Sequence, residues 1–185
     1  MNCTSCNNGV LNETLLEADF WAHTCSSCGG NWILIEDFAT WKETNSDYNF
    51  SDDISVEETQ ITDSKKALIC PSSGTIMRKF RISATNDHKI DYSSKVGGVW
   101  LDKGEWELLK SENLAGSLNS ILTNHWQAKI KQTNAATNFS ELYLQKFGSE
   151  NYQKAKEFRD WLVNHELKSD LKAYVLAEDP YSADK

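Results

Sequence analysis

The hydrophobic pattern differs between the two parts of the sequence, with strand-like segments before Leu114 and helix-like spacing after it. In residues 10–24 apolar and polar positions alternate over short runs, which predicts strands near 10–16 and 19–24 with a turn at Glu17 and Ala18. The run NWILI at 31–35 offers a third strand. A further strand is predicted by TIMRKFRIS at 75–83. Its two faces would be Ile76, Arg78, Phe80 and Ile82 on one side, and Met77, Lys79 and Arg81 on the other.

From Leu114 onward apolar positions recur every three or four residues, which predicts helices. Gly148 is expected to end one of them, because glycine readily adopts the left-handed conformation that follows many helix C-termini. Strands followed by helices indicate an α+β protein. About 70 helical residues make a small core, so packing onto the preceding module or onto another chain is expected. The stripes comprise Leu118, Ile121, Leu122, Trp126 and Ile130; Phe139, Leu142, Tyr143 and Phe147; Tyr152, Ala155, Phe158, Trp161 and Leu162; and Leu171, Tyr174 and Val175.

Four of the five cysteines form two C-x-x-C pairs, Cys3 with Cys6 and Cys25 with Cys28, separated by 18 residues. This spacing is typical of a zinc site in which two loops at the ends of a hairpin supply four thiolates. A redox pair of the thioredoxin type, or disulfide-bonded or free cysteines, are the alternatives. Four protein ligands leave no open coordination position, so the sequence favours one structural Zn²⁺. With few apolar residues of its own, this module should depend on its metal.

A second copy of the same frame follows 68 residues later. CGGNW at 28–32 corresponds to VGGVW at 96–100, and each copy is followed by an apolar run and aromatic residues. In this alignment Cys70 takes the place of Cys3. Ser73, Ser93 and Val96 stand where the other three ligands would be. The second copy therefore keeps the glycines and the tryptophan but not the metal ligands.

The pattern C-x-x-C, C-x-x-C-G-G-x-W and then W-L-D-x-G-E resembles the transcription-factor-IIB-type zinc-ribbon family of small bacterial proteins. The first copy matches at the four cysteines, Gly29, Gly30 and Trp32 but reads ILIED in place of LDxGE. The resemblance covers about residues 1–41 and 67–110. It implies a ribbon fold with one zinc and, in the second copy, a degenerate ribbon, but no specific role. The second copy matches at Cys70, Pro71, Gly97, Gly98, Trp100, Leu101, Asp102, Gly104 and Glu105.

The residues kept in the second copy are ones that shape the backbone or cap a helix, rather than metal ligands. Asp102 and Glu105 have the spacing of a capping box at a helix N-terminus. Capping accounts for both residues better than catalysis by paired carboxylates. A mixed metal site of Cys70, His88 and Asp91 is a weaker alternative, because Cys70 also suits a buried apolar position. We therefore expect a metal-free scaffold that is held by its core, with Val96 filling the place of a thiolate.

The net charge of −8 is unevenly distributed along the chain. Residues 1–41 carry −5 with no Lys or Arg, residues 42–64 carry −6, residues 65–110 carry +4 and residues 111–185 carry −1. Together, the motifs, the resemblance and the hydrophobic periodicity predict a zinc ribbon at 1–41, a metal-free ribbon-like module at 67–112 and a helical domain at 113–185. The charge and the lack of a sustained period predict a mobile or loosely docked acidic linker at 42–66. A face for phosphate or an acidic partner would use Arg78, Lys79, Arg81, Lys89 and Lys95, although such residues on a half-exposed strand often serve solubility alone.

These features favour some function classes over others. The sequence has no Gly-rich phosphate loop and no nucleophile paired with a base, so an enzyme with a small-molecule substrate is not expected. It has neither a secretory signal nor an apolar run long enough for a membrane span, which predicts a cytoplasmic location. We expect an adaptor that binds another protein, with transcription and translation as candidate settings. The alternative is a nucleic-acid-binding transcriptional regulator that uses the basic module.

Overall fold

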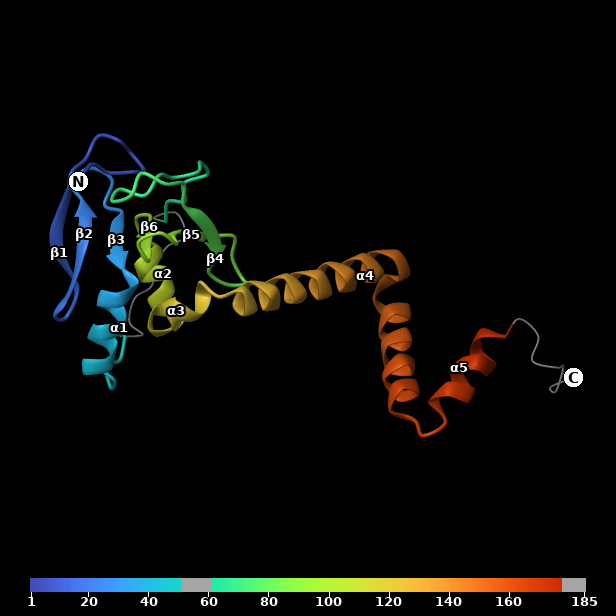
Figure 1. The fold of residues 1–185 in the computed structure, drawn as a ribbon. Helices are drawn as coiled ribbons and strands as arrows, with labels where there is room; N and C mark the ends of the chain where they lie inside the picture. Colours follow the sequence, from blue (N-terminus) through green and yellow to red (C-terminus); the bar gives the residue numbers. More distant parts are fainter. Residues whose placement is uncertain (51–60, 178–185) are drawn as a thin grey trace, which may run out of the picture. The chain divides into compact units, whose positions relative to one another are not determined.

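The computed structural model describes residues 1–50 and 61–177 (Figure 1). The chain divides into two compact units, Met1–Thr133 and Asn134–Lys185. The acidic linker expected at 42–66 lies partly outside the described residues. Within the described part of the chain, no helix combines the length and the apolar character that a membrane crossing requires.

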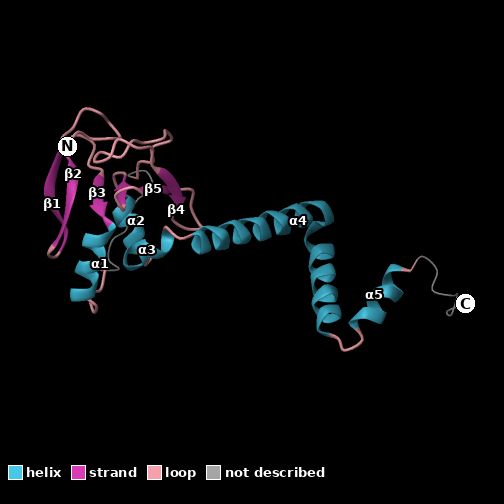
Figure 2. Cartoon of the chain, in the orientation of Figure 1, coloured by secondary structure: helices cyan, strands magenta, loops and turns pink. Residues whose placement is uncertain are grey.

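In the described part of the first unit, six strands form one antiparallel sheet (Figure 2). Its order is β1-β2-β3-β6-β5-β4. The first two strands correspond to the two predicted near 10–16 and 19–24. The bounds are β1 Leu11–Glu17, β2 Phe20–Cys25, β3 Asn31–Leu34, β4 Arg78–Arg81, β5 Lys89–Ser93 and β6 Gly98–Leu101.

The two halves of this sheet have the same order of elements. Strands β1 to β3 lead into helix α1 (Ile35–Thr44), and strands β4 to β6 lead into helix α2 (Glu105–Ser111). The halves meet where β3 pairs with β6, with Trp32 opposite Trp100 and Ile33 opposite Val99. The segments expected as a ribbon and as a ribbon-like module therefore share one continuous sheet.

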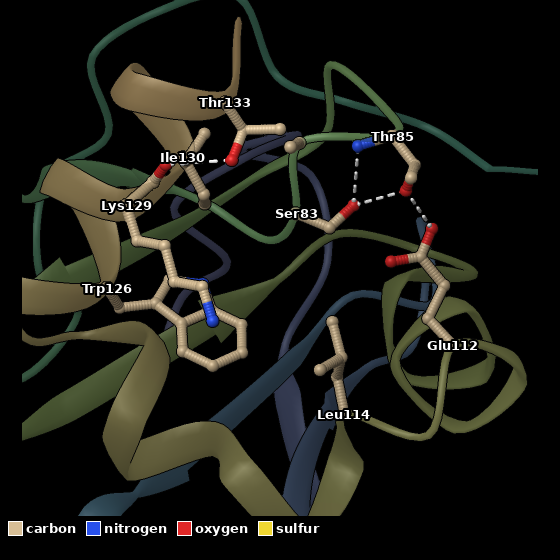
Figure 3. Close-up of a pocket in the computed structure, with 9 residues that line it drawn as sticks. Ser83, Thr85, Glu112, Leu114, Trp126, Lys129, Ile130 and Thr133 are labelled. Atoms are coloured by element: carbon tan, nitrogen blue, oxygen red, sulfur yellow. Dashed lines mark hydrogen bonds between the residues drawn. The ribbon is translucent and has the colours of Figure 1, made fainter. Parts of the chain in front are cut away.

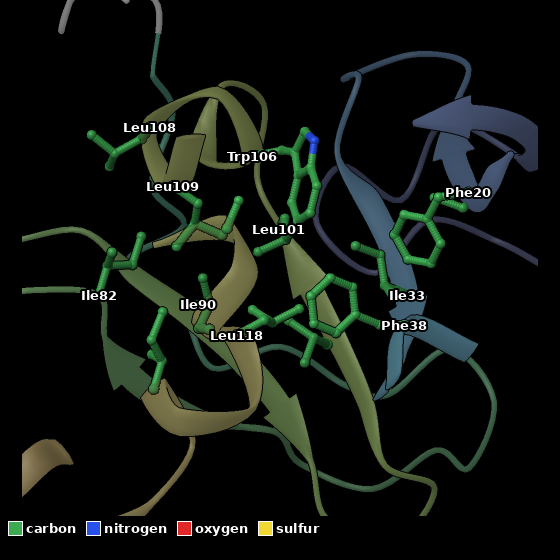
Figure 4. Packing of buried hydrophobic residues seen from close by; sticks show 14 of the residues in the cluster. Phe20, Ile33, Phe38, Ile82, Ile90, Leu101, Trp106, Leu108, Leu109 and Leu118 are labelled. Atoms are coloured by element: carbon green, nitrogen blue, oxygen red, sulfur yellow. The ribbon is translucent and has the colours of Figure 1, made fainter. Parts of the chain in front are cut away.

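The two faces of the sheet bury different clusters. Because successive strand residues point to opposite faces, Ile33 and Val99 face one side while Trp32 and Trp100 face the other. The helix-side cluster receives α1 and α2 through Phe38 and Trp106 (Figure 4). The cysteine-side cluster consists of Cys3, Leu11, Cys25, Trp32, Leu68, Cys70, Met77 and Trp100.

Glu17, at the end of β1, ties the helix side together. Its carboxylate accepts hydrogen bonds from Tyr48 Oη at 2.6 Å, Trp106 Nε1 at 2.8 Å and Lys110 Nζ at 2.6 Å. Hydrogen bonds from Lys110, Tyr48 and Trp106 hold the pKa of Glu17 below its usual range, although burial alone would raise it. This carboxylate therefore joins the first half of the sheet to the helix that follows the second half.

The chain after α2 packs back on the first unit. A short 3₁₀ turn η2 (Ala115–Ser117) and helix α3 (Leu118–Ile121) bury Leu118 and Ile121 in the helix-side cluster. At the start of helix α4 (Asn124–Asn164), Gln127 donates to Arg81 O at 2.9 Å and accepts from Arg81 N at 3.1 Å, so it occupies part of the open edge of β4. The helical domain was expected from residue 113, but the second unit begins at Asn134. The difference arises because residues between 113 and 133 pack into the helix-side cluster of the first unit.

The second unit contains most of α4 and helix α5 (Lys168–Leu176). Gly148 has φ 75° and ψ 161° and interrupts α4, at the position where a break was predicted. The stripes of this unit do not form a buried core in the described residues. Phe139 is 60% exposed and Trp161 is 50% exposed.

Candidate metal centre

Four thiols converge at one end of the first half of the sheet. Cys3 and Cys6 belong to the loop before β1, Cys25 ends β2, and Cys28 lies in the turn before β3. The Sγ atoms of Cys3 and Cys28 are 3.6 Å apart, and those of Cys6 and Cys25 are 3.7 Å apart. All four sulfurs lie within 4.8 Å of one another. A tetrahedral Zn²⁺ with zinc–sulfur bonds of about 2.3 Å requires sulfurs about 3.8 Å apart, so the four residues fit this metal.

Backbone amides organise both cysteine loops. Cys6 N donates to Cys3 Sγ at 3.5 Å, and the amides of Ser27 and Cys28 donate to Cys25 Sγ at 3.4 Å. Such bonds stabilise the thiolate form that a metal binds. The amides of the residues that follow Cys6 lower the pKa of its thiol to about 6, whereas burial raises the pKa of Cys28 and of Cys3.

Gly9 belongs to this site, although the sequence pattern did not single it out. A Cβ at this position would lie 2.3 Å from Cys25 Sγ. Cys3 N also donates to Gly9 O at 2.9 Å, which closes the first loop. A glycine three residues after Cys6 was the available signal, but its contact is with the second cysteine pair and so depends on the folded hairpin.

The residues between Cys3 and Cys6 fasten this loop to the second half of the sheet. Thr4 Oγ1 donates to Ile69 O and accepts from Ile69 N at 3.1 Å. Ser5 Oγ donates to Asp102 Oδ1 at 3.1 Å. The metal loop is therefore anchored on the residue before Cys70 and on the carboxylate that follows β6.

Residues 2–44 match a family model described as "Transcription factor zinc-finger". This segment is a zinc ribbon. The resemblance inferred from the cysteine and glycine pattern is confirmed for the first copy, and its four cysteines together form one structural zinc site. The match ends before the second copy, so the interpretation of that copy as a degenerate ribbon remains a prediction. No curated protein and no solved structure matches the chain.

The second half of the sheet repeats the loop geometry around Cys70. Ser73 N donates to Cys70 Sγ at 3.3 Å, as Cys6 N does to Cys3 Sγ in the ribbon. Burial would raise the pKa of Cys70, but the hydroxyls of Ser73 and Ser93 and nearby amides lower it below its usual value. Val96 packs against the cysteine-side cluster, as expected for a residue that fills space.

The alternative metal site of Cys70, His88 and Asp91 is not assembled. Among the described residues, potential metal ligands gather only at the four cysteines and at Asp63, Asp102 and Glu105. Asp91 instead pairs with Lys79 at 2.7 Å. Burial raises the pKa of Asp91 to about 6, an effect that Lys79 opposes.

Only one of the two hydrogen bonds of the capping box predicted at Asp102 and Glu105 forms. Glu105 Oε2 accepts from Asp102 N at 2.8 Å, as a capping box requires. The residue that precedes α2 is Gly104, and no side-chain cap bond is present there. The Asp102 carboxylate turns to other groups instead, accepting from Trp100 Nε1 at 2.8 Å and from Ser64 N at 2.6 Å. Asp102 therefore positions the Trp100 ring rather than the first turn of α2.

The basic residues of the second half do not form one free face. Lys79 pairs with Asp91, and Arg81 pairs with Asp87 at 2.8 Å. Arg78 is exposed and lies over the Phe80 ring at 5.3 Å. Lys89 is half-buried and Lys95 is exposed, and neither forms an ion pair within the described residues. The two predicted faces are both partly covered, because Phe80 and Ile82 lie in the helix-side cluster and Met77 lies in the cysteine-side cluster. Ile76, at the start of the segment, is 71% exposed.

A cleft of about 420 Å³ lies between the loop after β4 and the start of α4 (Figure 3). Its apolar wall is formed by Leu114, Trp126 and Ile130. Glu112 at its rim already accepts from Thr85 Oγ1 at 3.1 Å and from Asn86 Nδ2 at 2.7 Å. This carboxylate therefore serves to hold the loop.

Proposed function

We propose that this protein is a non-enzymatic zinc-binding adaptor that docks on another protein through its helical second unit. The observation that carries the proposal is the row of exposed aromatic residues on α4. Phe139, Tyr143 and Phe147 stack along one face, with ring centroids 6.5 Å and 5.3 Å apart. Phe158 and Trp161 form a separate exposed aromatic pair after Gly148. Exposed apolar surface of this extent is typical of interaction sites.

The charge distribution supports a protein partner over nucleic acid. The zinc ribbon carries no Lys or Arg in residues 1–41. Lys79 and Arg81 in the basic strand are engaged by Asp91 and Asp87. Binding to phosphates requires cations at the contact surface, and two of the five candidate cations are already paired within the fold.

The test is affinity capture from an extract, followed by reconstitution with the purified captured protein. Phe139→Ser, Tyr143→Ser and Phe147→Ser in one chain should abolish capture. The matched control is Asn138→Ser with Gln145→Ser, which changes exposed polar residues on the same helix. A direct complex that forms equally well with the aromatic variant would contradict the proposal.

The alternative, a transcriptional regulator that binds nucleic acid, draws support from the family match and from Arg78, Lys89 and Lys95. Fluorescence anisotropy with generic DNA and RNA at low salt separates the two proposals. Binding that weakens steeply with salt and is lost in Arg78→Gln, Lys89→Gln and Lys95→Gln would favour the alternative. We expect no binding at low salt.

A further inference from the structure

Four carboxylates gather around the junction between β6 and α2. Asp91 comes from β5, Asp102 follows β6, Glu105 begins α2, and Asp63 is contributed by the segment that returns from the linker. Asp91, Asp102 and Glu105 are 1%, 4% and 1% exposed. Carboxylate oxygens of Asp63, Asp102 and Glu105 lie within 4.8 Å of one another.

The charges of this cluster are poorly compensated within the described residues. Lys79 pairs with Asp91, and no other ion pair to these four carboxylates occurs in the described part of the chain. Neighbouring carboxylates repel one another, and burial of uncompensated charge is costly. The fold therefore holds together groups that require a cation or protons between them.

Three buried oxygens of the cluster also lack hydrogen-bond partners. These are Asp63 Oδ1, Asp91 Oδ1 and Glu105 Oε1, none of which has a partner in the described residues. Buried side-chain oxygens are nearly always satisfied in folded proteins, and unsatisfied ones often mark an ion or a water molecule. Glu105 is the strongest indicator, because the residue is almost fully buried while only its Oε2 atom is bonded, to Asp102 N.

Asp102 is held in place for such a role. Its Oδ1 accepts from Trp100 Nε1 and Ser5 Oγ, and its Oδ2 accepts from Ser64 N, which leaves Oδ2 a second lone pair. Carboxylate oxygens are the ligands that Ca²⁺, Mg²⁺ and Mn²⁺ prefer, whereas the thiolates of the ribbon select zinc.

We propose that Asp63, Asp102 and Glu105 bind a hard divalent cation, Ca²⁺, Mg²⁺ or Mn²⁺, in addition to the zinc of the ribbon. The cation satisfies Glu105 Oε1 and Asp63 Oδ1 and joins the returning linker segment to the start of α2. Because Ser5 donates to the same Asp102 carboxylate, the site is connected to the first cysteine loop. The proposal is independent of the partner of the helical unit.

The test uses the full chain, loaded with zinc, and terbium as the probe. Tb³⁺ binds calcium-type sites, and its emission is sensitised by a nearby indole such as Trp100, which hydrogen-bonds Asp102. We expect one saturable terbium site that is displaced by Ca²⁺, Mg²⁺ or Mn²⁺, and a rise in the thermal unfolding midpoint on addition of the same cation.

Asp63→Asn is the principal variant, since Asp63 is half-buried and its replacement should not prevent folding. Asp47→Asn, which changes an exposed acid at the other end of the linker, is the matched control. Asp63→Asn should weaken terbium binding by at least the roughly 10- to 100-fold that loss of an outer partner costs a metal site. The control should retain full binding.

Two results would overturn the proposal. One is terbium emission that is absent or is equally strong in Asp63→Asn, which would place the metal elsewhere. The other is an unsubstituted chain whose unfolding midpoint does not respond to added cations, together with a Glu105→Gln chain whose midpoint is unchanged or raised. That outcome would show that a proton on Glu105, rather than a metal ion, compensates the cluster.

Discussion

At the scale of single residues, the tryptophan ring of each Gly-Gly-x-Trp motif packs against the second glycine of the other motif. A Cβ on Gly30 would lie 2.4 Å from Trp100 Cζ2, and a Cβ on Gly98 would lie 2.1 Å from Trp32 Cζ2. The first glycine of each motif has a different task, because Gly29 and Gly97 have φ values of 73° and 63°. Each motif therefore needs one glycine for its turn and one for the tryptophan of the other motif.

Gly98→Ala should destabilise the protein, because the new methyl group would overlap the buried Trp32 ring. Overpacking of this kind typically costs about 1–3 kcal/mol of the free energy of unfolding. Urea denaturation of the zinc-loaded chain measures the change. Gly74→Ala is an informative comparison, since Gly74 has a positive φ but no atom within 4 Å of its Cβ position. Gly98 itself does not have a positive φ, so a Gly98→Ala variant as stable as the unsubstituted protein would contradict the contact with the Trp32 ring.

Zinc affinity should fall as the pH falls. Burial raises the pKa of Cys3 and Cys28, so these thiols retain their protons at neutral pH in the metal-free chain and must release them when zinc binds. The Cys6 thiol, with a pKa of about 6, is already largely ionised. Competition titrations from pH 8 to pH 6.5 should show zinc binding weaken by about tenfold per released proton per pH unit. A dissociation constant that does not vary over this range would contradict the assignment.

The contacts of Asp102 show which part of a residue's role can be predicted from sequence. The spacing to Glu105 correctly indicates that Glu105 bonds back to the Asp102 amide, because that bond joins residues three apart. The partners of the Asp102 side chain include Ser5 and Ser64, which are 97 and 38 positions away. The same distinction applies to Gly9, whose close neighbour Cys25 is near only in the folded hairpin.

At the scale of elements, the pairing of β3 with β6 makes the ribbon part of a larger sheet, so its stability is not expected to depend on zinc alone. The number of cysteines and their spacing predict a ribbon that depends on its metal. In the structure the ribbon also contributes Phe20, Ile33 and Phe38 to a core that it shares with α2 and α3. Local alternation predicts β1, β2 and β4, and a short apolar run predicts β3, but no strand was predicted at β5. The pairing of two strands that are far apart in sequence leaves no local signal.

Removal of zinc should therefore loosen the cysteine loops without unfolding the sheet. Hydrogen exchange with a chelator present should show loss of protection in residues 3–9 and 25–30, while β5, β6 and α2 remain protected. The same experiment on the zinc-loaded chain provides the reference. Global loss of protection on chelation would show that the shared core cannot hold the fold and that the metal dominates its stability.

At the scale of the whole molecule, the two units differ in where their apolar residues lie. Leu118 in the first unit is fully buried, whereas Phe139 in the second is 60% exposed. Both belong to stripes with helical spacing, and the spacing alone cannot distinguish a stripe that is covered by the chain from one that is not. Periodicity predicts the helices, but whether other parts of the chain cover their apolar faces depends on the assembled fold.

Substitutions in the two stripes should accordingly have different effects on stability. Leu118→Ala should lower the free energy of unfolding by about 2–5 kcal/mol, because it leaves a cavity in the helix-side cluster. Phe139→Ala should change it by less than about 0.5 kcal/mol, as is usual for exposed positions. Thermal unfolding of the purified chain compares them. A large loss from Phe139→Ala would mean that this surface is already covered, for example by a second copy of the chain.

The reciprocal contacts, in which the tryptophan of each half packs against a glycine of the other, have the symmetry of a self-complementary dimer interface. Here, however, both halves belong to one polypeptide. A covalent tether fixes the effective concentration of one half around the other, so dilution cannot separate them. In a two-chain assembly each protomer would need its own means of staying folded between encounters. Within one chain, the half that carries the four cysteines always stays next to the other half, so the shared sheet forms without a separate assembly step.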